Sequence, residues 1–298
     1  MICQALDALE VDRLNGLIIT HLDNDHAGGL SKVLRTYADR IDALLINPDR
    51  TAEAHMRLVA ADVMLFAERY TERLHVAYAK PPSAKLELHW EGSSIRFLWP
   101  LYGDWIRRAP TSSNDVSVVL RFQHGDHVFL FGGDLPLACW EVLVRRLGGP
   151  LVKADVFKAP HHGAHLYPSP TFDYDALYGA VGAHYVIVCS GSKDSPQLPH
   201  LHAARRGARV LCTGLHKQCL LLPEKVRAAA EQVHGARLTG LHVEHAVPCA
   251  GNVRVRSDGA HLEVEPAIQS HQRILSAVIA EGGRPQCNDV SQEEITAV

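Results

Sequence analysis

Short runs of apolar, β-branched residues alternate along the chain with longer segments whose apolar residues recur at helical spacing. In the first third of the chain, the short runs predict buried strands at residues 16–20 and 43–47. The longer segments predict helices at residues 24–39 and 51–74, the second of them capped by Thr51. Strand and helix therefore alternate from the beginning of the chain, which is typical of an α/β fold.

The rest of the chain adds hairpins to this pattern. Glu91-Gly92, His124-Gly125-Asp126 and Ser257-Asp258-Gly259 each separate two short apolar runs, as the turns of β-hairpins do. Further strands are expected at residues 155–159, 185–189, 209–213 and 218–222, and helices at residues 135–147, 172–181 and 268–280. Strands and helices mixed in this way predict two sheets covered by helices.

The composition excludes several classes of protein. Of the 298 residues, 47% are hydrophobic and 21% are charged, so the chain is neither disordered nor collagen-like. The net charge of −3 excludes a strongly basic nucleic-acid coat protein. No uncharged apolar run approaches the ~18 residues of a membrane span and no signal peptide is recognisable, which predicts a cytoplasmic protein. The seven cysteines form no CxxC pair, so reduced thiols are the simplest interpretation.

The chain has 19 histidines, an unusually large number, and its first motif places two of them beside two aspartates. After the first strand the sequence reads His21-Leu22-Asp23-Asn24-Asp25-His26-Ala27-Gly28-Gly29. Alternate side chains of an extended segment point the same way, so His21, Asp23 and Asp25 can converge, and His26 can join them where the helix begins. Imidazole together with carboxylate suits Zn, Mn or Fe. In the alternative, Asp23 or Asp25 caps the helix and the histidines are merely exposed, but four ligands after one strand favour a metal site.

Three later stretches follow this motif along the chain: Ser-Asn-Asp-Val-Ser-Val-Val-Leu at residues 113–120, Phe-Leu-Phe-Gly-Gly-Asp-Leu at 129–135 and Phe-Lys-Ala-Pro-His-His-Gly at 157–163. Together with the first motif they resemble the metallo-β-lactamase superfamily. Its usual first motif is His-x-His-x-Asp-His. The variant with Asp23 as the second ligand is similar to that of the hydrolase domain of ComEC-type competence (DNA-uptake) proteins. The resemblance extends from about residue 14 to residue 264.

This resemblance implies a four-layer αββα sandwich with two divalent metal ions, Zn or Mn, in a cleft at the sheet edges. It assigns His21 and Asp23 to one ion, Asp25 and His26 to the other, and Asp134 to both. A carboxylate in place of an imidazole favours Mn over Zn slightly, because it makes the site harder.

The remaining ligand positions leave alternatives open. Asp134 could instead cap the helix that follows it. His161 and His162 are adjacent, so one of them is expected to bind metal, with His161 favoured as the ligand and His162 facing the substrate or supporting the site. His200 is either the last ligand or an exposed loop residue, and His202 competes with it for the ligand role.

The resemblance places a hydrolase domain at residues 1–265 and a C-terminal helix and polar tail at residues 266–298. In the family, two or three strands precede the first motif. Here only about 15 residues precede the first strand, and they predict a helix. The N-terminal strands are therefore expected to be missing from this chain, which would leave one sheet edge unpaired.

The function that this resemblance favours is metal-dependent hydrolysis of a phosphodiester, with nucleic acid as a candidate substrate, by metal-activated water. Asp25, Asp134 and His162 are then the catalytic residues. The first alternative is a lactone, thioester or lactam hydrolase on the same fold. The second is a truncated, inactive metal-binding scaffold. The missing strands favour it, and so does Pro199-His200, which reverses the order of His and Pro in the family's Gly-His-Pro motif.

Overall fold

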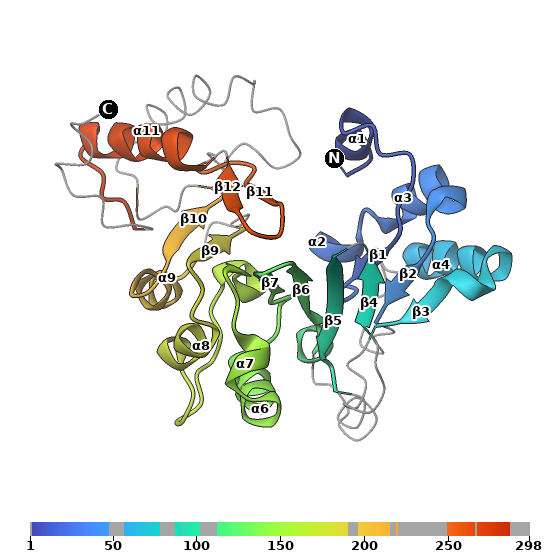
Figure 1. The fold of residues 1–298 in the computed structure, drawn as a ribbon, viewed down its shortest axis with the longest axis horizontal. Coiled ribbons are helices and arrows are strands. Elements are labelled where there is room, and N and C mark those ends of the chain that lie inside the picture. Colours follow the sequence, from blue (N-terminus) through green and yellow to red (C-terminus); the bar gives the residue numbers. More distant parts are fainter. Residues whose placement is uncertain are drawn as a thin grey trace. The chain divides into compact units, whose positions relative to one another are not determined.

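The computed structural model of the protein describes residues 2–47, 57–77, 87–90, 92–101, 112–189, 196–214, 219, 249–265 and 267–286. These residues form a mixed α/β structure with three sheets, which confirms the expected α/β class (Figure 1). The chain divides into two compact units. The first comprises Met1–Glu87, Arg96–Leu120 and Gly133–Leu135, and the second comprises Leu88–Ile95, Arg121–Gly132 and Pro136–Val298. The expected boundary at residue 265 stays a prediction.

The first unit contains a three-stranded parallel sheet with the order β1-β2-β3. Its elements are α1 (Ile2–Ala8), β1 (Leu17–Ile19), α2 (Asn24–Ala27), α3 (Leu30–Tyr37), η1 (Ala38–Arg40), β2 (Leu44–Ile46), α4 (Arg57–Arg69), η3 (Thr71–Arg73), β3 (Leu74–Val76) and η4 (Ser113–Val116). Because the three strands are parallel, their carboxyl ends lie at the same edge of the sheet. His21 follows β1 at that edge.

The core of the first unit lies between this sheet and its helices. Four residues of α3, spaced three and four apart, are buried together with residues of β2 and α4: Leu30, Val33, Leu34, Tyr37, Leu44, Val59 and Phe66. Burying one such large side chain contributes about 1.5–3 kcal/mol. This packing fixes α2 and α3 beside β1, and thereby fixes the position of the first motif.

Two expectations for the first unit need correction. The helix expected at residues 24–39 is broken at Gly28-Gly29 into α2 and α3. The helix expected at residues 51–74 ends at Arg69, and Leu74–Val76 forms β3 instead, because these residues pair in parallel with β2. Thr51, expected to cap that helix, lies outside the described residues.

The second unit holds most of a seven-stranded sheet with the order β10-β9-β8-β7-β6-β5-β4, and a two-stranded sheet, β11-β12. The strands are β4 (Glu87–Trp90), β5 (Ser93–Trp99), β6 (Val119–His124), β7 (His127–Phe131), β8 (Val156–Lys158), β9 (Tyr185–Val188), β10 (Arg209–Cys212), β11 (Arg254–Ser257) and β12 (Leu262–Glu265). The helices are α6 (Leu137–Leu147), α7 (Gly149–Val152), η5 (Pro160–Gly163), α8 (Tyr174–Val181), α9 (Leu198–Arg205) and α11 (Ala267–Ala280).

Successive side chains of β8 point to opposite faces of this larger sheet. Phe157 packs edge-on against Trp140 of α6 and Tyr178 of α8, with ring centroids 5.7 and 5.8 Å away. Its neighbour Val156 points the other way and shares a buried cluster with Val264 of β12. Helices therefore cover one face of the sheet, and the β11-β12 hairpin covers part of the other (Figure 1).

Most strands expected in this half agree with the structure to within two or three residues. Residues 113–116, at the start of the motif at 113–120, form the short helix η4. Helix α9 was not expected from the sequence. Pro199 occupies its first turn, where a missing N–H costs nothing. The strand expected at residues 218–222 lies almost entirely outside the described residues. Among the residues that the structure describes, no helix is long and apolar enough to cross a membrane.

Candidate metal centre

The first motif follows β1 directly. The chain leaves the strand after Ile19 and enters α2 at Asn24. Asp23 occupies the N-cap position with an extended backbone, yet its side chain makes no capping hydrogen bond. Instead, Oδ2 of Asp23 lies 3.6 Å from Nε2 of His21. Asp23 is therefore the N-cap residue of α2 by its backbone, while its carboxylate remains directed toward His21.

Five expected ligands come together within the first unit: His21, Asp23, Asp25, His26 and Asp134. Nε2 of His26 lies 3.3 Å from Oδ2 of Asp134 and 3.9 Å from Oδ2 of Asp25. Nε2 of His21 lies 3.8 Å from the same oxygen of Asp134. Separations of about 3–4 Å are usual between atoms that bind one cation at about 2 Å. The first unit therefore contains a possible His/Asp metal site, in which one oxygen of Asp134 faces both histidines.

Asp134 is placed by a tight turn and not by a helix. The helix α6 begins at Leu137 with Pro136 at its N-cap, so the alternative in which Asp134 caps that helix is wrong. Gly133 precedes it with φ of 53°, a left-handed conformation that glycine adopts without steric cost. The Asp134 side chain is buried, and its backbone N–H donates a hydrogen bond of 2.8 Å to Oγ of Ser117.

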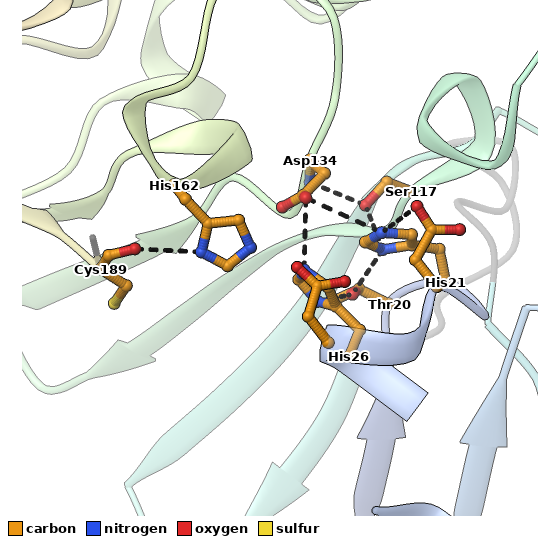
Figure 2. Close-up of polar contacts among 9 residues, drawn as sticks. Thr20, His21, His26, Ser117, Asp134, His162 and Cys189 are labelled. Atoms are coloured by element: carbon orange, nitrogen blue, oxygen red, sulfur yellow. Dashed lines mark hydrogen bonds and ion pairs between the residues drawn. The ribbon is translucent and has the colours of Figure 1, made fainter. Parts of the chain in front are cut away.

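Two hydroxyl groups that the sequence did not indicate as part of the site contact its histidines. Oγ1 of Thr20 lies 3.0 Å from Nδ1 of His21 and 3.1 Å from Nδ1 of His26. Oγ of Ser117 lies 3.1 Å from Nδ1 of His21 (Figure 2). Ser117 belongs to the stretch at residues 113–120 that carried the resemblance, but nothing in the sequence indicates that its hydroxyl faces His21, because the two residues are 96 positions apart.

The electrostatics of His21 fit a metal ligand. Burial, and then the neighbouring His26, lower the pKa of His21 to about 4, although the surrounding carboxylates act in the opposite direction. The imidazole is therefore neutral near pH 7, which is the form that binds metal. Its Nε2 atom is buried and makes no hydrogen bond within the described residues. A buried polar atom of this kind, facing carboxylates, is the feature that a divalent cation would satisfy.

The second unit carries the His-His-Gly motif in η5. His161 and His162 have φ of 50° and 55°, so two successive non-glycine residues are in the left-handed region. Each such residue costs about 1–3 kcal/mol, and residues of this kind cluster at functional sites. Nδ1 of His162 donates a hydrogen bond of 3.0 Å to the carbonyl oxygen of Cys189 (Figure 2). The neutral ring of His162 then carries its lone pair on Nε2, an orientation that metal-binding histidines commonly have.

His200 is buried in α9 of the second unit. Its Nδ1 shares a hydrogen bond of 2.8 Å with the hydroxyl of Tyr178, and its ring centroid lies 4.4 Å from that of Tyr174. Burial lowers the pKa of His200 to about 3. The alternative in which His200 is an exposed loop residue is therefore wrong. His202, expected to compete with it, is exposed on the same helix.

Several known proteins are similar in sequence to part of this chain. Recombination protein 2 of Haemophilus influenzae is 28% identical over 193 residues, which are 65% of this chain and 20% of that protein. Competence protein ComA of Neisseria gonorrhoeae is 27% identical over 198 residues, or 66% of this chain and 23% of that protein. Ribonuclease Z of Mycolicibacterium paratuberculosis is 31% identical over 146 residues, or 45% of this chain and 49% of that protein.

The chain resembles a ComEC-type metallo-β-lactamase superfamily hydrolase. It spans between about a fifth and about a half of the length of these ComEC-like and ribonuclease Z relatives. No family model matches it. Among solved structures, the metallo-β-lactamase fold protein YhfI of Bacillus subtilis matches with a TM-score of 0.40 and 13% identity, over 71% of this chain and 80% of YhfI. Because this TM-score is low, the ComEC-like resemblance rests on the sequence relatives alone.

Proposed function

We propose that this chain is a metal-dependent hydrolase that cleaves phosphodiester bonds in nucleic acid. The observation that carries the proposal is the buried Nε2 atom of His21, which makes no hydrogen bond within the described residues and lies 3.6 and 3.8 Å from the carboxylates of Asp23 and Asp134. The names of two relatives, Recombination protein 2 and Ribonuclease Z, support nucleic acid as the substrate class.

In this proposal two divalent ions, Zn or Mn, bind to the chain. His21 and Asp23 would hold one ion, Asp25 and His26 would hold the other, and Asp134 would serve both. The pairing of ligands is supported by the separations of 3.6 Å between His21 and Asp23 and 3.9 Å between His26 and Asp25. The shared role of Asp134 is supported by its Oδ2 atom, which lies within 4 Å of Nε2 of both histidines. When bound, two such ions lower the pKa of water and stabilise negative charge on the attacking and leaving oxygens.

The side chains have distinct tasks in the proposed reaction. The neutral imidazole of His21 presents a lone pair without first losing a proton, because its pKa is about 4. Asp25 is the most exposed of the acidic ligands, with 62% of its side chain accessible, so it can also accept a proton from the reacting water. Asp134 is buried, which excludes solvent from the shared carboxylate.

His161, His162 and His200, which belong to the second unit, are further candidate functional residues in this proposal. The hydrogen bond from His162 to the Cys189 carbonyl supports His162 as the ligand or substrate-facing base, since its Nε2 is then an acceptor. The sequence favoured His161 as the ligand, and that assignment stays a prediction. His200 is held by Tyr178 through Nδ1, which supports a ligand role through Nε2.

Metal content is the first test. Protein purified without chelator is expected to contain about two Mn or Zn ions per chain, measured by elemental analysis, because five candidate ligands converge in the first unit alone. Apo-protein is expected to melt at a higher temperature after either metal is added. A chain with no bound metal and no thermal shift with Mn or Zn would contradict the proposal.

Substrate class is the second test. Bis-p-nitrophenyl phosphate, single-stranded DNA, single-stranded RNA, a homoserine lactone and nitrocefin are offered side by side with Mn and with Zn. Turnover of at least one phosphodiester, abolished by EDTA and restored by metal, is expected. Turnover of the lactone or nitrocefin alone would replace the proposal by the lactone or lactam hydrolase. A metal-loaded protein that turns over none of the five would indicate a binding scaffold.

A further inference from the structure

The hydroxyls of Thr20 and Ser117 occupy the side of the metal site that faces away from the carboxylates. Each lies within 3.1 Å of Nδ1 of His21, and Thr20 is equally close to Nδ1 of His26. Nε2 of each histidine faces Asp134 instead. Both imidazole rings are thus contacted by a hydroxyl at one nitrogen and by a carboxylate at the other (Figure 2).

The donors in this network can be assigned by elimination. The backbone N–H of Asp134 can only donate, so Oγ of Ser117 accepts from it and has one further lone pair. A histidine that offers the Nε2 lone pair to a cation carries its proton on Nδ1. Nδ1 of His26 then donates to Thr20, and Nδ1 of His21 donates to Thr20 or Ser117. Two hydroxyl oxygens can accept all three protons, because each has two lone pairs.

We propose that Thr20 and Ser117 are positioning residues, which hold His21 and His26 with Nε2 available to the metal and tie His21 to the backbone of Asp134. The inference rests on the proposed metal site. Ser117 has the larger role of the two in joining the segments, since it contacts both the histidine after β1 and the turn after Gly133. Groups that orient metal-binding histidines in this way typically contribute about 10- to 100-fold to metal affinity.

The experiment compares hydroxyl removal with hydroxyl retention at the same position. Thr20→Val removes the hydroxyl and keeps the shape of the side chain, whereas Thr20→Ser keeps the hydroxyl. Affinity for Mn and for Zn is measured on apo-protein by competition with a chromogenic chelator. Thr20→Val and Ser117→Ala are expected to bind about 10- to 100-fold more weakly than wild type, and Thr20→Ser to bind within a few-fold of it.

A matched control separates positioning from a loss of stability. Ser112 also carries a hydroxyl in the segment before β6, where it takes part in a capping box with Asp115. Ser112→Ala is expected to lower the melting temperature without changing metal affinity. Should Ser117→Ala fail to fold, the Thr20 pair still decides the question.

The outcomes distinguish this inference from the proposed function. Wild-type protein that binds metal, with Thr20→Val and Ser117→Ala binding equally well, would overturn the positioning role and leave the proposed function intact. Wild-type protein that binds neither Mn nor Zn would overturn the proposed function, and the positioning role with it. The cobalt-loaded forms add an independent readout, because a displaced histidine changes the visible absorption spectrum even where affinity changes little.

Discussion

Asp134→Asn is expected to lower phosphodiester hydrolysis by at least about 100-fold while the protein remains folded. The amide has nearly the shape of the carboxylate, so the turn after Gly133 and the hydrogen bond from the Asp134 backbone to Ser117 are retained. What is lost is the negative charge that faces both His21 and His26 at 3.8 and 3.3 Å. Turnover of bis-p-nitrophenyl phosphate, metal content and the far-ultraviolet circular dichroism spectrum are measured together.

The control for this substitution is Asp126→Asn. Asp126 is an exposed carboxylate in the turn between β6 and β7, so its replacement changes the net charge equally without touching the candidate site. It is expected to retain full activity. Asp134→Asn protein within a factor of two of wild-type activity would show that Asp134 does not hold metal.

Gly133→Ala is expected to reduce the free energy of unfolding by roughly 2–4 kcal/mol. The residue has φ of 53°, and an added Cβ would lie 2.5 Å from Oγ of Ser117 and 2.6 Å from the carbonyl oxygen of Val118. Neither neighbour can retreat easily, because Ser117 is fully buried and Val118 donates its own N–H to the carbonyl of Thr20. Urea denaturation of the two proteins measures the difference.

Gly149→Ala is the matched control. Gly149 begins the short helix α7, and an added Cβ there meets no atom within 4 Å. The substitution is expected to leave stability unchanged or to raise it slightly, as replacing an unstrained glycine does. If Gly133→Ala were no less stable than Gly149→Ala, the tight turn would not constrain the position of Asp134 as the structure indicates.

The sequence predicted the local part of the candidate site well and its long-range part poorly. His21, Asp23, Asp25 and His26 could be recognised because ligands six residues apart or fewer at the end of a strand can converge whatever the rest of the fold does. Asp134 could be placed near them only through the resemblance, since the hydrophobic pattern fits a helix cap equally well.

Other features depended on tertiary structure that no local pattern contains. Leu74 belongs to β3 because β2 offers a parallel partner, although its position continues the amphipathic pattern of α4. His200 is buried because Tyr174 and Tyr178 of α8 pack beside it, whereas the sequence alone left open whether it is a ligand or an exposed loop residue. Ser117 acquires its neighbour His21 only when the chain folds.

The difference between the local and the distant ligands has a consequence for how metal stabilises the protein. Because residues 21–26 are contiguous, an unfolded chain can still gather two histidines and two carboxylates around a cation. A metal ion that binds to the unfolded chain as well as to the folded one stabilises the folded protein less. Asp134 joins that group only in the folded chain. Saturating metal would therefore raise the unfolding free energy less than its affinity for the native protein suggests, and the gain would come mainly from Asp134 and any other ligand that is distant from residues 21–26 in the sequence.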